Sequence, residues 1–408
     1  MLYLKKSELV STYHISEKTA SNWIREAKTG KLNLELYEEK GKSYIANTNK
    51  NITLIEQLVE KRKKYRNTLT IKTVTPDPEF YRLFTKSQVF NIISNLDIRR
   101  EIPFQYGYFD GGAELWDRYA ERLAAEKISN FLTSTIEQLK AHQEYVDRLA
   151  SRYKRVNIID IGPGNAMPVR AFLQHLLDAK KLDRYVAVDI SPAMINIAER
   201  NIRKWFGDKV RFESYQADVN YDRFGDLLHE YAIEETGEES INIVLAFGGT
   251  FANVRDADGA FKVIHDSLNR RDLFIYNLKL DSYAAQHYFD FDTAHSTPAL
   301  DIKSKMVLDM LNIDESFYDV EVGYDAGSRS RYMRIRLKVE LSVKFMFETG
   351  ERTLTFDKNE TILVWRFWHQ NVQDVITQLY RNDFDVLQSN LTEDKQYLMT
   401  VSRVKSER

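Results

Sequence analysis

Residues Val156–Ser191, with the sequence VNIIDIGPGNAMPVRAFLQHLLDAKKLDRYVAVDIS, contain the strongest structural signal in the chain. The mainly apolar run Val156–Ile161 predicts a buried parallel strand. Apolar residues then recur at helical spacing from Ala166 to Leu177. Gly162 and Gly164 are therefore expected in a tight turn between strand and helix, where the backbone can approach a ligand without interference from a Cβ atom.

Three later segments repeat this pattern of a strand followed by a polar or glycine-containing turn. They are Tyr185–Val188 before Asp189, Val210–Tyr215 before Asp218, and Ile241–Phe247 before Gly248. The carboxyl ends of parallel strands meet at one edge of a sheet, so these turns should surround one ligand. Asp189 follows the first strand by about 25–30 residues, close to the spacing at which nucleotide-binding folds place a ribose-binding carboxylate.

Acidic residues at the first three strand ends favour S-adenosylmethionine (SAM) over NAD as the ligand. The third glycine of a dinucleotide fingerprint is missing, because Met167 occupies its place and Pro168 follows. Asp160 would face the cationic methionine end, Asp189 the ribose hydroxyls, and Asp218 the adenine amino group. The predicted cofactor-binding residues are Asp160, Gly162, Gly164, Asp189, Ser191, Asp218, Val219, Phe247 and Gly248.

Several blocks resemble the histidine-specific SAM-dependent methyltransferases, whose best-known member trimethylates the histidine amino group in ergothioneine biosynthesis. The blocks are GPGNAMPVR (162–170), RYVAVDIS (184–191), the Asp218 turn, AFGGTFAN (246–253) and YFDGGAELW (108–116). The similarity covers about residues 75–405. It implies a class I SAM-methyltransferase fold, an α/β Rossmann-like sheet with an inserted α+β substrate domain, and methyl transfer to an amine of an amino acid or related small molecule.

The resemblance also implies roles for individual residues. Gly162 and Asp189 would hold SAM, and Asn253 would hold the carboxylate or amine of the substrate. Tyr108 or Tyr106 would line the substrate pocket. SAM is already activated, so no protein nucleophile is expected. Substrate orientation is assigned to Tyr108, Asn253 and Tyr332.

Two segments depart from the family pattern. Where the histidine-binding members carry a Glu that grips the imidazole, this chain has Ser330-Arg331-Tyr332-Met333-Arg334, without an acid. Residues 363–369, LVWRFWH, are more aromatic and basic than the corresponding family segment. These departures predict a cationic, aromatic-lined pocket that prefers an acidic or planar substrate, whose identity the sequence leaves open.

Residues 1–70 form a separate basic module. They contain eleven Lys and three Arg against eight Glu, a net charge of +6, whereas the whole chain carries −2. Two predicted helices, Lys6–His14 and Glu17–Lys28 with Ser16 as the cap, suggest a helix-turn-helix, and residues 38–45 a β-hairpin wing. The predicted partner is DNA, contacted by side chains of the second helix, or alternatively a protein. The candidate contact residues are Lys18, Thr19, Ser21, Asn22 and Arg25.

The predicted domains are 1–70, 71–150 (helical part of the substrate domain), 151–280 (SAM-binding core), 281–370 (β-rich insertion) and 371–408 (closing helix and strands). Five apolar residues at helical intervals, Trp116, Tyr119, Leu123, Ile128 and Leu132, are interpreted as core. Residues Tyr332–Phe347 are predicted to form a strand pair. The insertion and residues 79–150 should together cover the SAM cleft.

Composition excludes several other classes of function. The chain has no Cys, which removes disulfides and thiolate chemistry, and its eight His show no metal-ligand spacing. No apolar run approaches the ~20 residues needed to span a bilayer, and no signal peptide is evident, so no membrane partner and a cytoplasmic location are expected. The alternative to an enzyme is a DNA-binding regulator whose methyltransferase-like domain senses SAM or an amino-acid ligand.

Overall fold

The computed structural model describes residues 3–405 except 14, 16, 127–129, 233–239 and 291–297, and it describes no side chains for 62–70 and 229–232. The chain divides into two compact units. The first comprises Met1–Thr73 with the short stretches Val339–Ser342 and Thr355–Asp357, and the second comprises the rest. This partition leaves the finer five-part division a prediction.

The first unit has helices in both ranges expected for a helix-turn-helix. Its elements are β1 (Tyr3–Leu4), α1 (Lys6–Tyr13), α2 (Glu17–Lys28), β2 (Leu36–Glu39), β3 (Lys42–Ala46) and α3 (Asn49–Thr70), with the sheet order β1-β3-β2. Leu9, Trp23 and Ile45 form part of their shared core. The predicted cap, Ser16, lies outside the described residues.

On α2, Lys18 and Arg25 are exposed, as a contact surface would require. Thr19 is only 5 % exposed and faces the core, so the prediction that it contacts a partner is wrong. Trp23, four residues further along the helix, is also buried, so Thr19 lies on the buried face of the helix.

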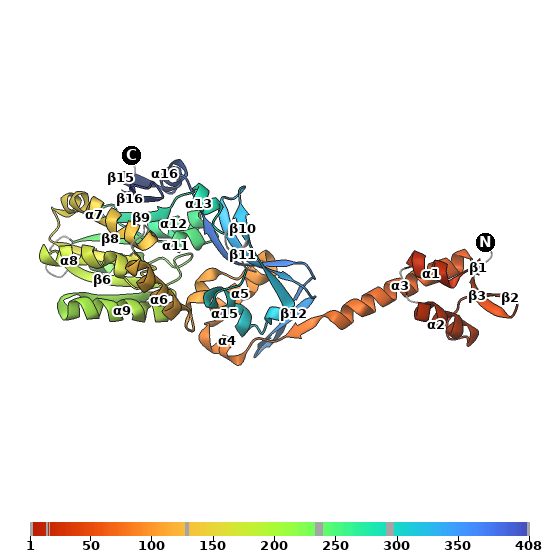
Figure 1. Ribbon diagram of the computed structural model, residues 1–408. Helices are drawn as coiled ribbons and strands as arrows, with labels where there is room; N and C mark the ends of the chain where they lie inside the picture. The colour runs from red at the N-terminus through yellow and green to blue at the C-terminus, as the bar shows by residue number, and fades with distance from the viewer. Residues whose placement is uncertain are drawn as a thin grey trace. The chain divides into compact units, whose positions relative to one another are not determined.

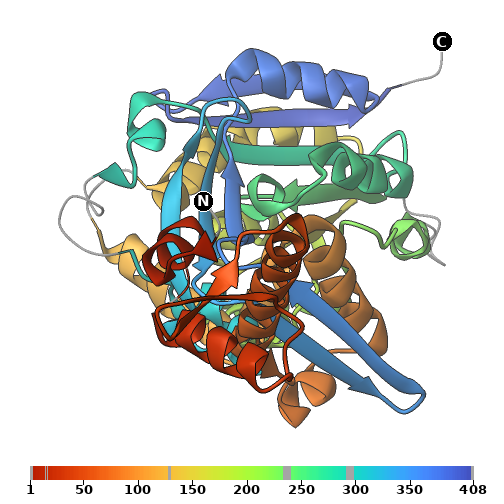
Figure 2. The same ribbon diagram turned by 90° about the vertical axis from the view of Figure 1, so that its right-hand side faces the viewer.

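A seven-stranded sheet forms the centre of the second unit, in the order β15-β16-β9-β8-β5-β6-β7. Its strands are β5 (Arg155–Ile161), β6 (Leu182–Asp189), β7 (Arg211–Gln216), β8 (Ser240–Ala246), β9 (Leu273–Lys279), β15 (Phe384–Leu391) and β16 (Tyr397–Val404). The five strands from β5 to β9 run parallel, and β16 pairs antiparallel with both β9 and β15. Figure 2 shows this closing hairpin in blue, beneath its helix.

Helices cover both faces of this sheet because its buried strands alternate apolar residues between two cores. Ile158 of β5 packs in a core with α7 (Phe131–Ala150), α8 (Arg170–Asp178) and α9 (Pro192–Phe206). Ile159 packs in the other core, with α10 (Gly225–Ala232), α12 (Ala257–Ser267) and α16 (Val372–Arg381). The strand order reverses between β5 and β8, and this reversal opens a crevice at the carboxyl ends of the strands.

Helices and a smaller sheet lie beside that edge (Figure 1). The helices are α4 (Pro78–Leu83), α5 (Lys86–Arg99), η1 (Phe104–Tyr108), α6 (Gly112–Ala125), α11 (Thr250–Asn253), α13 (Tyr283–Gln286) and α15 (Ile302–Met310). The smaller sheet has the order β10-β11-β14, formed by Tyr318–Asp325, Ser330–Leu337 and Thr361–Trp368. The short helices η2 (Met167–Val169), η3 (Gly207–Lys209) and η4 (Glu315–Phe317) complete the described helices.

The strand pair predicted within Tyr332–Phe347 is wrong in its pairing. Both strands exist, but β11 pairs with β10 and β14, whereas β12 (Leu341–Phe347) belongs to another sheet, of order β13-β12-β4. That sheet includes β13 (Gly350–Phe356) and β4 (Lys72–Val74). The N–H of Leu337 donates to Glu360 O and the N–H of Lys338 to Phe317 O, so the end of β11 is held between β10 and β14.

No described helix combines the length and the apolar composition that crossing a bilayer requires.

Candidate active site

The turn after β5 brings a buried carboxyl and a glycine to the crevice. Asp160 is 3 % exposed, and the hydroxyl of Tyr185 donates to its Oδ2 at 2.8 Å. Burial raises the pKa of Asp160 to about 7. Gly162 has φ +62°, and a Cβ there would lie 2.6 Å from Thr250 Oγ1. Only glycine therefore allows this turn to approach α11 so closely.

Two further carboxyls occupy the ends of β6 and the loop after β7. Asp189 Oδ1 accepts from the Ser191 N–H at 2.8 Å, and burial raises the pKa of Asp189 to about 7. Asp218 Oδ1 accepts from the N–H and the side-chain amide of Asn220 at 3.0 and 2.6 Å. Its Oδ2 accepts from Gln105 Nε2 at 3.3 Å, and burial raises its pKa.

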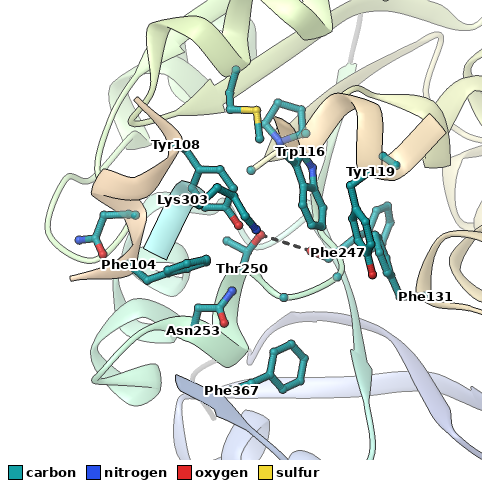
Figure 3. Close-up of a pocket in the computed structure, with 18 of the residues that line it drawn as sticks. Phe104, Tyr108, Trp116, Tyr119, Phe131, Phe247, Thr250, Asn253, Lys303 and Phe367 are labelled. Carbon is teal, nitrogen blue, oxygen red and sulfur yellow. Dashed lines mark hydrogen bonds between the residues drawn. The ribbon is translucent and has the colours of Figure 1, made fainter. Parts of the chain in front are cut away.

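These groups open into one cavity of about 880 Å³ within the second unit. It contains most of the predicted site residues: Tyr108, Asp160, Gly162, Gly164, Asp189, Asp218, Val219, Phe247, Gly248 and Asn253. Figure 3 shows Lys303 beside Tyr108 and Trp116, with Asn253 and Phe367 lower in the view. The predicted cofactor edge and the residues of α11 therefore share one enclosure.

Three predicted residues do not line the cavity. Ser191 is fully buried, and its Oγ donates to Tyr108 O at 2.8 Å and accepts from the Met194 N–H. Ser191 thus connects η1 to the end of β6 on the side away from the cavity. The Tyr106 hydroxyl donates to Asn91 Oδ1 at 3.1 Å, so Tyr108 is the tyrosine of the pair that lines the cavity.

Tyr332 points away from the cavity. Its neighbours Arg331 and Met333 line the cavity, and successive residues of a strand face opposite sides. The Tyr332 hydroxyl instead lies 2.7 Å from where a Cβ of Gly323 on β10 would be. The role predicted for Tyr332 in orienting a substrate is therefore not supported by its position.

Four residues that were interpreted as core also belong to the cavity wall. Trp116, Tyr119, Leu123 and Leu132 line it, while Ile128 is outside the described residues. The Trp116 ring stacks on Phe131 at 5.5 Å, and a Cβ at Gly164 would lie 2.9 Å from Trp116 Nε1. Helical spacing alone could not distinguish cavity wall from core.

Lys303 was not predicted by any sequence pattern. Its Nζ lies 5.3, 5.5 and 5.2 Å from the ring centres of Phe104, Tyr108 and Trp116, and 3.7 Å from Asp301 Oδ2. Burial lowers the pKa of Lys303. A Cβ at Gly107 would lie 2.6 Å from Lys303 O, so this residue reaches the cavity only because α15 packs closely on η1.

Asn253 stands at the junction between the sheet edge and the small sheet. Its Oδ1 is buried and has no hydrogen-bond partner among the described residues. A Cβ at Gly249 would lie 3.0 Å from Asn253 Nδ2 and 3.2 Å from a ring carbon of Phe367. The Trp368 Nε1–H donates to Val254 O at 2.6 Å, which attaches β14 to the end of α11.

The acidic edge fits a cationic nucleoside ligand. Among the described residues, no Lys or Arg forms an ion pair with Asp160, Asp189 or Asp218. Burying carboxylates without cations is costly, so a ligand that carries positive charge and hydroxyl donors suits them. Gly162, Gly164 and Gly248 all have positive φ around this edge and give the ligand access to the backbone.

The strand order with its reversed closing hairpin, together with this acidic edge, defines a class I SAM-dependent methyltransferase. The chain belongs to the family of histidine-specific, SAM-dependent methyltransferases, whose model matches residues 86–404. The predicted fold class, the family and SAM as cofactor are thereby confirmed. A search of the curated proteins found no match.

Solved structures similar to the chain include other methyltransferases at low identity. A SAM-dependent methyltransferase from Clostridium acetobutylicum is 10 % identical, covers 73 % of this chain and 100 % of its own, and has a TM-score of 0.38. The glycopeptide N-methyltransferase MtfA with SAM is 14 % identical, covers 67 % of this chain and 94 % of its own, and has a TM-score of 0.34. The sugar N-methyltransferase KedS8 from Streptoalloteichus sp. is 12 % identical, covers 67 % of this chain and 88 % of its own, and has a TM-score of 0.32. The family assignment rests on the family match alone.

Proposed function

We propose that the protein methylates an amine of an amino acid or a related small molecule. The observation that carries this proposal is the orphan acceptor Asn253 Oδ1, buried in the cavity wall on the helix that contacts Gly162. A buried acceptor without a partner is unfavourable until a ligand donates to it, and an amine N–H is such a donor. The family's description as histidine-specific also supports an amino-acid acceptor.

The protein's part in the reaction is to hold and orient the two ligands. When bound, SAM supplies an activated methyl group, and Asp160, Asp189 and Asp218 are the residues that would hold it. Asn253 would orient the acceptor nitrogen, which must be unprotonated to react. Burial raises the pKa of Tyr108, so its hydroxyl stays protonated and can donate a hydrogen bond to the substrate.

Turnover with a panel of amino acids and simple amines tests this proposal. We expect S-adenosylhomocysteine (SAH) to form with at least one amine, and NMR of the product to show the methyl group on nitrogen. Asn253→Ala should lower kcat/KM roughly 10–100-fold, the equivalent of one buried hydrogen bond, without changing SAM affinity.

Gln373→Ala, at an exposed amide on α16, is the matched control and should leave kcat/KM unchanged. Turnover only with hydroxyl acceptors, or an unaltered rate in Asn253→Ala, would contradict the proposal. The partner of residues 1–70, whether DNA or protein, the regulatory alternative and the cytoplasmic location stay predictions from the sequence.

A further inference from the structure

Arg331, on β11, is a buried cation that lines the cavity. It is only 6 % exposed, and none of the carboxylates in the described part of the chain forms an ion pair with it. Arginine is rarely buried to this degree unless an acid pairs with it. The neighbouring Arg334 shows the usual arrangement, with its Nε bonded to Glu321 at 2.8 Å on the other side of the strand.

The surroundings of Arg331 are aromatic and neutral. Its Nε–H donates to His369 Nε2 at 2.9 Å, and burial lowers the pKa of His369 to about 3, so this partner is uncharged. The guanidinium carbon lies 4.2 Å from the ring centre of Tyr288 and 5.0 Å from that of Phe367. The rings and His369 hold the guanidinium plane in place, and its terminal N–H groups donate to no acceptor in the part of the chain that the structure describes.

Lys279, at the end of β9, adds a second cation to the same cavity. It forms no ion pair with any described residue, and its Nζ lies 5.8 Å from the ring centre of Tyr397. Burial lowers its pKa, the charge of Arg331 lowers it further, and the carboxylate of Asp394 opposes these effects, so the two cations lie near enough to repel each other. Their mutual repulsion favours the binding of an anion between them.

Stacking does not remove this need for an anion. Cation–π contacts return only part of the hydration that a guanidinium loses on burial, and a neutral imidazole returns one hydrogen bond. Arginine's fork of N–H groups matches the paired oxygens of a carboxylate or phosphate. A ligand oxyanion is therefore the partner that the described residues of this site do not provide.

We propose that the acceptor amine carries an oxyanion on its side chain, a carboxylate or a phosphate in addition to any α-carboxylate, and that this group binds Arg331 with support from Lys279. The Phe367 ring connects the two ends of this site: it contacts the guanidinium on one side and approaches Gly249 and Asn253 on the other. The amine lies at Asn253 and the oxyanion at Arg331. This inference rests on the proposed amine methyltransferase, and it favours an acidic acceptor over the uncharged imidazole side chain of histidine.

Calorimetric titration in the presence of saturating SAH tests the inference directly. Two matched pairs of probes are titrated, L-glutamate against L-glutamine and O-phospho-L-serine against L-serine. At least one acidic probe should bind tenfold or more tightly than its neutral partner, and the pair that shows the larger difference identifies the oxyanion as carboxylate or phosphate. Equal binding within both pairs overturns the inference.

Variants then assign the preference to Arg331. Arg331→Gln keeps a donor for His369 but removes the charge, so it should lose tenfold or more in affinity for the acidic probe and less than threefold for the neutral one. Arg331→Lys should recover only part of the loss, because it restores charge without the fork. Arg334→Gln is the control, since that arginine is already paired and points away from the cavity. An acid preference that survives in Arg331→Gln overturns the assignment.

A second measurement needs no knowledge of the acceptor. Inorganic phosphate, compared with chloride at equal ionic strength, should raise the Tm of the wild-type protein and of Arg334→Gln, but not that of Arg331→Gln. Equal Tm shifts in all three proteins overturn the oxyanion site. If the Tm shifts are equal but SAH still binds normally, only the oxyanion site is overturned and the proposed function stands. If SAH binds but no amine is turned over, the proposed function is contradicted instead.

Discussion

The two ends of the cavity carry opposite charge. Among the described residues, the sheet edge presents Asp160, Asp189 and Asp218 without an ion-paired cation, and the small sheet and β9 present Arg331 and Lys279 without an ion-paired acid. Neither end neutralises the other within the protein. This difference would let one enclosure distinguish two ligands, since a cationic cofactor would be attracted to one end and the anionic acceptor proposed above to the other.

The largest expected effect is at the acidic end. Asp189→Asn should weaken SAM binding roughly 100-fold, about 3 kcal/mol, because it removes the charged acceptor for two ribose hydroxyls. Calorimetric titration of SAM measures it. Asp208→Asn, at a fully exposed carboxylate, is the control and should bind SAM as the wild type does. An unchanged Kd for SAM in Asp189→Asn would contradict the assignment of the acidic end to the cofactor.

The pH dependence of SAM binding sharpens the same comparison. The pKa values of Asp160 and Asp189 are raised to about 7 by burial, so in the free protein both carboxyls become neutral below that pH. Affinity for a cationic ligand should therefore fall about tenfold or more per pH unit below 7 and level off above it. Titrations between pH 5 and 8 should show this slope, and Asp160→Asn should reduce it.

Stability of the ligand-free protein should change in the opposite direction. A carboxyl whose folded pKa is raised binds its proton more tightly in the folded state, so its contribution is complete below the unfolded value of 3.8 and is lost as pH rises through about 7. The Tm of the wild type should accordingly fall, relative to Asp160→Asn, between pH 4 and 7. A parallel pH profile in the two proteins would contradict the raised pKa.

The smallest expected effect is at Tyr332, on the strand that carries Arg331 but facing the other side. Tyr332→Phe removes a hydroxyl that packs against Gly323 outside the cavity, so kcat/KM should change less than twofold. Initial-rate measurements with an amine that is turned over in the panel described under Proposed function provide the comparison with Asn253→Ala. A tenfold loss of kcat/KM would mean that side chains on both faces of β11 contribute to the reaction.

The grouping of residues at the acidic end could be predicted from the sequence because its signals are local. Each strand and the residue that follows it are adjacent in the chain, and parallel strands bring such turns together whatever the rest of the chain does. Asp160, Asp189 and Asp218 therefore needed only the prediction of three strands and their order. Ser191 lies next to this edge but does not line the cavity, because its hydroxyl bonds to the backbone of Tyr108.

The acceptor end was not readable in the same way, because it depends on long-range register. A shift of one residue exchanges Tyr332 for Arg331 at the cavity wall, and the sequence of β11 alone does not fix which face turns inward. Lys303 reaches the cavity only through the close packing of α15 on η1. Trp116 follows the helical spacing of an ordinary core residue, so its place in the wall needed the tertiary structure.

The pairing of β16 with β9 also has a consequence for how the chain folds during synthesis. Residues 280–396 separate the two strands in sequence, and this interval contains most of the residues around Arg331. On the ribosome, β9 must wait as an unpaired sheet edge until that whole interval and β16 have emerged. The cofactor sheet and the acceptor wall are therefore completed together, and a nascent chain stalled before residue 397 would expose an aggregation-prone strand.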